Sequence, residues 1–206
     1  MLLLDSFFYS HWFDWDKQLF QFVNGNHSPF WDQVMWVITS NWFGVAFFLL
    51  LAVVTILFYR KQSWKILLFI AVTMLIADAV GSRVLKPTAK RLRPSHDAEY
   101  HGDYQVNVHQ RSDGTYYRGG KYSWPSNHAI NYLSASILFF YFLRSKVKRR
   151  WLLATLLFST TLLVCYSRIY VGVHYPFDIF CGWLLAAFLS GLAIFILSRW
   201  IKPQLS

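Results

Sequence analysis

The sequence has little charge, little cysteine and no stretch that resembles a secretory signal. Only 15% of its 206 residues are Asp, Glu, Lys or Arg, whereas 55% are hydrophobic and 20% are aromatic. Cys165 and Cys181 both fall in apolar runs, which argues against a disulfide-rich secreted scaffold and favours buried thiols. The N-terminus has no basic segment leading into an uninterrupted apolar core, so we expect no cleaved signal peptide. This composition is unusual for a soluble domain and typical of an integral membrane protein.

Five apolar runs are candidates for membrane-spanning helices: Trp42–Tyr59, Trp64–Val80, Ala129–Leu143, Trp151–Tyr166 and Ile179–Ser198. A span needs about 20 apolar residues, within a range of roughly 17 to 25. The first and last runs satisfy this condition, and the third and fourth reach it when their polar flanks are included. We therefore predict an all-α, integral membrane helical bundle with about five transmembrane helices, which forms a single domain over residues 1–206.

Acidic residues are missing from the short connections between these runs. The segments "RKQSWK" and "RSKVKRR" and the residues after 198 hold half of the 20 basic residues and no carboxylate. The positive-inside rule counts Lys and Arg in short loops, so it places these segments in the cytoplasm. The N-terminus and residues 81–127 and 168–178 then face the periplasm or exterior of a bacterial inner membrane. Because topology explains much of the net charge of +10, we expect no nucleic-acid partner.

The first 41 residues contain no run that could span a membrane. We predict helices over Asp14–Val23 and Pro29–Thr39, with Ser28 as the N-cap of the second helix and proline as its first residue. Many Trp and Phe side chains in this segment suit the water–lipid interface. Residues 1–41 are therefore predicted to form interfacial helices that anchor the protein rather than take part in catalysis.

Residues 81–127 form the longest connection and are predicted to be an outer loop. Its part 95–123 is polar and rich in Tyr, His and Gly, which is typical of a lid or a binding element. Its histidines and carboxylates match no standard metal-ligand spacing, so we expect a solvated polar loop and no metal site at His96, Asp97, Glu99, His101, Asp103 and His109.

Three polar clusters interrupt the apolar sequence on the predicted outer side, namely "KPTAKRLRP", "WPSNHA" and "RIYVGVHYPFD". Taken singly, each has a structural explanation, because Lys and Arg at membrane edges snorkel and a lone His is usually a satisfied polar residue. Together they favour a functional site, since one membrane face collects Lys86, Arg93, Ser126, His128, Arg168, His174 and Asp178.

The basic members of these clusters suit a dianionic phosphate. Guanidinium groups such as those of Arg93 and Arg168 match phosphate oxygens in pairs, and Lys86 adds a third positive charge. The third and fifth spans both start on this side, so their free N–H groups point toward the same place. Ser126 is positioned as the N-cap of the third span, where its hydroxyl and the neighbouring amides could hold an oxyanion.

The histidines suit phosphoryl transfer. His174 and Asp178 are four residues apart, and Pro176 between them marks the start of the last span. A carboxylate on one imidazole nitrogen fixes the tautomer and makes the other nitrogen a better nucleophile. His128 comes from a different span and is placed to protonate a leaving oxygen, a task that suits its reference pKa of about 6.5. The basic residues would stabilise charge on the transferring group.

The ordered motifs Lys86-x6-Arg93-Pro94, Pro125-Ser126-x-His128 and Ser167-Arg168-x5-His174-x3-Asp178 resemble the signature of the type 2 phosphatidic acid phosphatase superfamily. The resemblance covers about residues 42–198. It implies a helical bundle with its site at the outer leaflet, a metal-independent reaction without cofactor through a phosphohistidine on His174, and His128 as the acid. It also implies phosphate binding by Lys86, Arg93, Ser126 and Arg168. The family commonly has glycine in place of Asn127, whose backbone N–H is retained and whose side chain is expected to enter the pocket.

Several alternatives stay open at this level. Undecaprenyl pyrophosphate is the favoured substrate, and phosphatidylglycerophosphate, phosphatidic acid and the lipid A phosphates are close alternatives. A phosphotransferase would use the same intermediate, whereas a non-catalytic anionic-lipid binding protein would have no use for His174 with Asp178. A soluble acid phosphatase or vanadate-dependent haloperoxidase would not need five apolar runs. The expected partners are the lipid phosphate and membrane lipids, the oligomeric state is open, and Asp78 needs a partner such as Arg83, Lys90 or a site cation.

Overall fold

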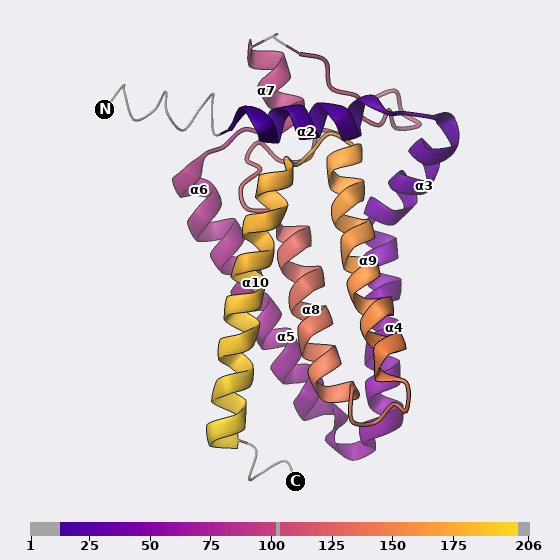
Figure 1. Ribbon diagram of the computed structural model, residues 1–206, viewed down its shortest axis with the longest axis vertical. Coiled ribbons are helices and arrows are strands. Elements are labelled where there is room, and N and C mark those ends of the chain that lie inside the picture. The colour runs from indigo at the N-terminus through magenta and orange to yellow at the C-terminus, as the bar shows by residue number, and fades with distance from the viewer. Residues whose placement is uncertain (1–12, 102–103, 202–206) are drawn as a thin grey trace.

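The computed structural model describes residues 13–101 and 104–201. All secondary-structure elements named in these residues are helices (Figure 1). Residues 1–12, part of the predicted interfacial segment, lie outside the described residues. Five long helices stand side by side: α4 (Asn41–Tyr59), α5 (Ser63–Ala79), α8 (Asn127–Leu143), α9 (Arg150–Tyr170) and α10 (Pro176–Ile196). The prediction of an all-α bundle is confirmed.

Three stretches are long and apolar enough to cross a membrane, namely Asn41–Ala89, Arg150–Tyr170 and Pro176–Arg199. The first contains both α4 and α5, which the short helix η1 (Arg60–Gln62) connects. The remaining long helix, α8, has 17 residues and packs against α5, α9 and α10. Its inward side chains are buried, whereas large apolar side chains on the other four helices are exposed to the surroundings. The bundle therefore has α8 at its core and an apolar outer surface suited to lipid.

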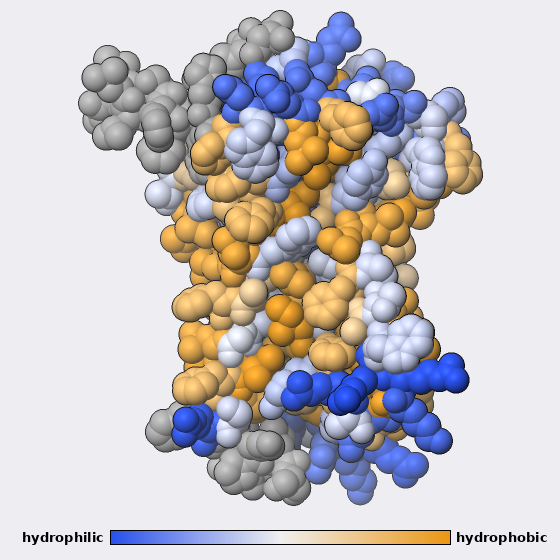
Figure 2. Space-filling model, in the orientation of Figure 1, coloured by the Kyte–Doolittle hydropathy of each residue, from blue (hydrophilic) through white to orange (hydrophobic). Residues whose placement is uncertain are grey.

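Hydrophilic residues gather at the two ends of the bundle, and hydrophobic residues cover the middle (Figure 2). One end, called the basic end here, carries η1, the connection between α8 and α9, and η3 (Leu197–Ile201). The opposite end, called the α2 end, carries α2 (Asp14–Gly25), α7 (Pro94–His101) and the starts of α8 and α10. The basic loops and the polar clusters thus lie at opposite ends, as predicted.

The two N-terminal helices form as predicted. In α3 (Pro29–Thr39), the Ser28 side chain accepts the N–H of Trp31 at 3.4 Å, and proline occupies the first position. α2 lies across the top of the bundle (Figure 1). It is more than an interfacial anchor, because it buries the polar side chains of Asp16 and Asn24 against the rest of the protein.

The segment 81–127 is a loop in part only. The helix α5 continues through the π-helix η2 (Val80–Leu85) into α6 (Lys86–Ala89), so Lys86 lies on a helix instead of in a loop. Lys90 then takes a left-handed conformation, with φ of 49°, and ends this helix. The rest of the segment reaches α8 through α7 and a folded connection that contains the isolated bridges Leu92–Tyr122 and Gln110–Tyr116.

Candidate active site

The predicted site residues gather at the α2 end, although separate stretches of sequence supply them. They lie on α6 (Lys86), just before α7 (Arg93), at the start of α8 (Ser126, Asn127 and His128), in the last turn of α9 (Arg168), before α10 (His174) and in its first turn (Asp178). Four of them are almost wholly buried, namely Ser126, Arg168, His174 and Asp178. The fold thus brings the three motifs together, with α8 and α10 in contact at their starts.

Close packing of α8 and α10 fixes the second and third motifs relative to each other. The backbone N–H of Ser126 donates to the carbonyl of Asp178 at 3.0 Å. Glycine at position 182 permits this approach, because a Cβ there would lie 2.9 Å from both the Ser126 carbonyl oxygen and the Ala129 Cβ. The two helix N-termini therefore meet, as the sequence predicted.

Asp178 holds His174 and caps α10 at the same time. His174 Nδ1 lies 3.4 Å from Asp178 Oδ2, and the same oxygen accepts the N–H of Tyr175 at 2.9 Å. Among residues 13–101 and 104–201, the other ring nitrogen of His174, Nε2, has no hydrogen-bond partner. Burial lowers the pKa of His174 well below its ordinary value, and the positive charges of Arg93, Lys86 and Arg168 lower it further. At neutral pH the imidazole is therefore neutral, which is the nucleophilic form.

Arg91, which the sequence reasoning did not select, holds the other side of Asp178. Its Nη1 donates to Asp178 Oδ1 at 2.8 Å, and its Nη2 donates to Asp16 Oδ2 at 2.6 Å. Asp16 Oδ1 in turn accepts the N–H of Phe177 at 2.8 Å. Asp16, Arg91 and Asp178 are 0%, 8% and 0% exposed, so the chain of ion pairs that ends at His174 is screened from water.

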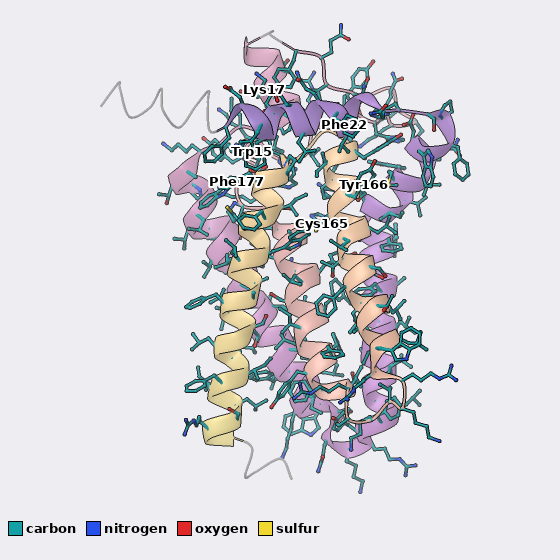
Figure 3. The ribbon with its side chains drawn as sticks, in the orientation of Figure 1. Trp15, Lys17, Phe22, Cys165, Tyr166 and Phe177 are labelled. Carbon is teal, nitrogen blue, oxygen red and sulfur yellow. The ribbon has the colours of Figure 1, made fainter. Side chains whose placement is uncertain are left out.

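Aromatic packing joins α2 to α10 beside this chain. Trp15 of α2 lies edge to face with Phe177 of α10, with ring centroids 6.2 Å apart (Figure 3). Phe13 packs on the same ring at 5.0 Å. Arg91 lies over the ring of Tyr175, 4.2 Å from its centroid. The "KPTAKRLRP" cluster offered a signal for Arg91, since three arginine or lysine side chains precede Arg93 there, but nothing in the sequence paired it with Asp16.

The first candidate phosphate ligand, Arg93, is fixed by the folded connection before α8. Its backbone N–H donates to the Lys121 carbonyl at 3.1 Å, and its Nε donates to the Tyr122 carbonyl at 3.2 Å. Gly119, with φ of 64°, lies against the guanidinium so closely that a Cβ would collide with it. Burial and the charge of Arg168 lower the pKa of Arg93 to about 10, so it stays protonated at neutral pH. Its buried Nη1 has no partner among the described residues.

The second candidate phosphate ligand, Arg168, is held by two side chains that lie outside the motifs. Its Nη1 donates to Thr39 Oγ1 at the end of α3, and its Nη2 donates to the hydroxyl of Tyr117 at 3.0 Å. Within the part of the chain that the structure describes, its buried Nε has no partner. Both arginines therefore keep a buried N–H group available, which is the arrangement an oxyanion requires. Segment 95–123 packs against the site through Tyr117 and Gly119.

Asn127 and Asp78 differ from expectation. The Asn127 side chain was expected in the pocket, but its Nδ2 donates to Asp78 Oδ1 at 2.7 Å, and Asn131 Nδ2 donates to the same oxygen at 2.9 Å. The partners found for Asp78 are thus two amides, where Arg83, Lys90 or a cation were expected. Both amides donate to the same carboxylate oxygen.

The predicted residues that remain are His128 and the polar residues of the outer loop. His128 lines a cavity of 320 Å³ at the α2 end together with Asn131 and Tyr132, and it lies near the charge of Arg168. In the polar loop, the expectation of a solvated surface is wrong for Asp97, which is 8% exposed. Its Oδ2 accepts the hydroxyls of Tyr104 at 3.1 Å and Tyr175 at 3.0 Å.

His109 is only partly solvated, because one face of its ring stacks on that of Trp36 with centroids 3.9 Å apart. The side chains of His101 and Asp103 lie outside the described residues. Over residues 13–101 and 104–201, no group of three or more His, Cys, Asp or Glu side chains could hold a metal ion.

Comparisons with known proteins identify the family. Residues 62–202 match the family model of the PAP2 superfamily. The chain is 34% identical over 188 residues to a lipid A 4'-phosphatase of Bacteroides thetaiotaomicron, which covers 89% of this chain and 77% of that protein. It is 31% identical over 193 residues to a lipid A 4'-phosphatase of Porphyromonas gingivalis, covering 90% and 76% of the two chains.

The fold is also that of a solved structure. The crystal structure of a PAP2-type phosphatidylglycerolphosphate phosphatase from Bacillus subtilis superimposes with a TM-score of 0.66, at 23% identity, over 91% of this chain and 86% of that one. At this identity the likeness concerns the fold alone, whereas the family match and the two relatives cover most of the sequence. The chain therefore belongs to the PAP2 superfamily, as a membrane phosphatase that acts on lipid phosphates.

Proposed function

We propose that the protein removes a phosphate from a lipid A-type phosphoglycolipid at the outer face of a bacterial inner membrane, through a phosphohistidine on His174 and without a metal ion. The observation that carries this proposal is the buried His174–Asp178 pair, set among arginines whose inward N–H groups are unpaired. The substrate class is supported by the two relatives named as lipid A 4'-phosphatases. The outward orientation is supported by the basic loops at the opposite end of the bundle.

In the first step, the lone pair of His174 Nε2 attacks phosphorus, and the bond from phosphorus to the lipid oxygen breaks. His128 donates its proton to that oxygen, so the lipid leaves as an alcohol. Asp178 holds the Nδ1 proton and stabilises the charge that the ring acquires. Arg93, Arg168 and Lys86 stabilise the phosphoryl oxygens, with the amides at the start of α8.

In the second step, water attacks the phosphohistidine. His128, now neutral, takes a proton from this water, the phosphorus–nitrogen bond breaks, and its electron pair returns to His174 Nε2. Inorganic phosphate leaves. A lipid hydroxyl in place of water would make the protein a phosphotransferase, so the acceptor decides between these two activities.

The substrate test uses detergent-purified protein with excess EDTA. We expect phosphate release from lipid A to exceed that from undecaprenyl pyrophosphate, the substrate favoured from the motifs, and from phosphatidylglycerophosphate. Faster release from undecaprenyl pyrophosphate would move the substrate assignment to that lipid. Loss of release in EDTA, with recovery on adding a divalent cation, would refute the metal-independent mechanism. Release that appears only when an acceptor lipid is added would indicate a phosphotransferase.

The environment of His174 predicts its titration. Burial and neighbouring cations place its pKa below the usual 6.5, so the nucleophilic neutral form should persist as the pH falls through 6.5 and be lost only at more acidic pH. Isotope-labelled histidine in the micelle-bound protein, followed by NMR, gives this pKa without substrate. The His174 signal is assigned by its absence in His174→Ala. A midpoint at or above 6.5 would contradict the described site.

A further inference from the structure

An apolar groove runs along the bundle between α4, α5 and α8, in reach of the candidate site. It has a volume of 630 Å³, and its lining extends along α5 from Leu67 to Asp78, with Phe48 and Phe139 on the other helices. The eleven helical steps from Leu67 to Asp78 span about 16 Å, roughly half of a hydrocarbon core of about 30 Å. The length of the groove along the bundle axis therefore matches the thickness of one leaflet. This length suits a single acyl chain of a lipid in that leaflet.

Hydrogen-bond acceptors without donors mark the outer end of this groove. A carboxylate only accepts, so the amides of Asn127 and Asn131 must both turn their NH₂ groups to Asp78 Oδ1. This turns their own oxygens away, and both Oδ1 atoms are buried without a partner in the described residues. These two buried oxygens thus share one feature: each can accept a hydrogen bond from a donor outside the protein.

The cluster lies just below the proposed chemistry. Asn131 follows His128 by three residues on α8, which places it about 4.5 Å deeper along the helix axis. Both residues line the cavity of 320 Å³, and that cavity shares Asn131 and Phe48 with the groove. A lipid whose phosphate reaches His128 would therefore present its next groups to the cluster and its chain to the groove.

We propose that Asp78, Asn127 and Asn131 bind a hydroxyl or an amide N–H that the substrate lipid carries between its phosphate-bearing group and its acyl chain. This inference rests on the proposed function and sharpens its substrate class. An amide-linked β-hydroxyacyl chain supplies such donors. Phosphatidic acid and polyprenyl diphosphates carry no donor between their phosphate and their chains, so they leave the two amide oxygens unpaired. The cluster therefore selects donor-bearing lipids, whereas the groove accepts any chain of suitable length.

The test compares two synthetic probes with the same phosphate and chain length. One is glucosamine phosphate with an amide-linked β-hydroxytetradecanoyl chain, and the other is glucose phosphate with an ester-linked tetradecanoyl chain. We expect Asn131→Leu to lower kcat/KM about tenfold for the amide probe, through KM, and to change it less than about twofold for the ester probe. The matched control is Ser159→Leu, a polar-to-leucine change on an exposed position of α9, outside the groove.

A second variant separates the polar cluster from the groove. Ala71→Trp fills the groove without changing the cluster, and we expect it to raise KM for both probes by a similar factor. An equal loss with both probes in Asn131→Leu would overturn the inference, because the cluster would then serve only the fold of the site. Unchanged kinetics in Asn131→Leu would overturn it too. If the unmodified protein is folded and hydrolyses neither probe, the proposed function itself is refuted.

Discussion

Replacing His174 with alanine is expected to lower phosphate release from the lipid by about four orders of magnitude or more. The nucleophile disappears, while Arg93 and Arg168 keep their positions, because their side chains bond to other residues and the backbone N–H of residue 174, which donates to the Arg168 carbonyl, is retained in alanine. Water would then have to attack the phosphate directly. Single-turnover phosphate release at saturating protein measures the loss, and thermal unfolding in the same detergent verifies that the variant is folded.

Two further observations sharpen this prediction. His109→Ala removes another imidazole at the same end of the protein and should leave the rate unchanged, since His109 stacks on Trp36 outside the site. The lipid is labelled in its phosphate, and the reaction is quenched rapidly with base or with acid. The unmodified protein should carry labelled phosphate that is stable in base and lost in acid, and His174→Ala should carry none. A His174→Ala protein that still turns over at more than a few per cent would require another nucleophile.

Replacing Arg91 with methionine is expected to cost about 3 to 5 kcal/mol of stability. The substitution leaves the carboxylates of Asp16 and Asp178 buried without the cation that bridges them at 2.6 and 2.8 Å. We also expect kcat to fall at least tenfold, roughly the effect of one lost charge-assisted hydrogen bond, because Asp178 is no longer held in place to orient His174. Unfolding in mixed micelles gives the stability, and steady-state hydrolysis gives kcat.

A double-mutant cycle tests whether Arg91 and Asp16 stabilise the protein through their mutual interaction or independently. Adding Asp16→Asn to Arg91→Met removes one of the two unpaired charges, so the double variant should be more stable than Arg91→Met alone. Arg91→Lys keeps the charge but cannot span both carboxylates with separate nitrogens, so it should retain more stability than activity. Additive losses in the cycle would show that Asp16 and Arg91 act independently, contrary to the hydrogen-bonded chain.

The bundle and the gathering of the motifs could be predicted because their signals are local in sequence. Apolar runs give the spans, and the spacing of His174 and Asp178 around Pro176 gives a helix start. The continuation of α5 into α6 could not be predicted in this way, because polar residues from Arg83 onward look like a loop when their surroundings are unknown. Their helix extends past the apolar run into the polar end of the bundle.

The residues that hold the site residues in place could not be predicted from the sequence, for a different reason. Asp16 reaches Arg91 across 75 positions, and Arg168 reaches Thr39 across 129. Neither Asp16 nor Thr39 belongs to a motif, and each was assigned to a segment predicted to anchor the protein. The Asn127 side chain was misplaced because its partner, Asp78, lies on another helix. Such pairings depend on which helices become neighbours, and no local pattern encodes that.

The placement of α2 across the bundle has a consequence for biosynthesis. Asp16 is synthesised long before its partner, because its contact with the N–H of Phe177 spans 161 positions. Contacts between distant segments form late because they close the longest loops. The nucleophile is therefore oriented only after α10 has been synthesised and has packed beneath α2, and a nascent chain that lacks α10 is inert toward the lipids around it.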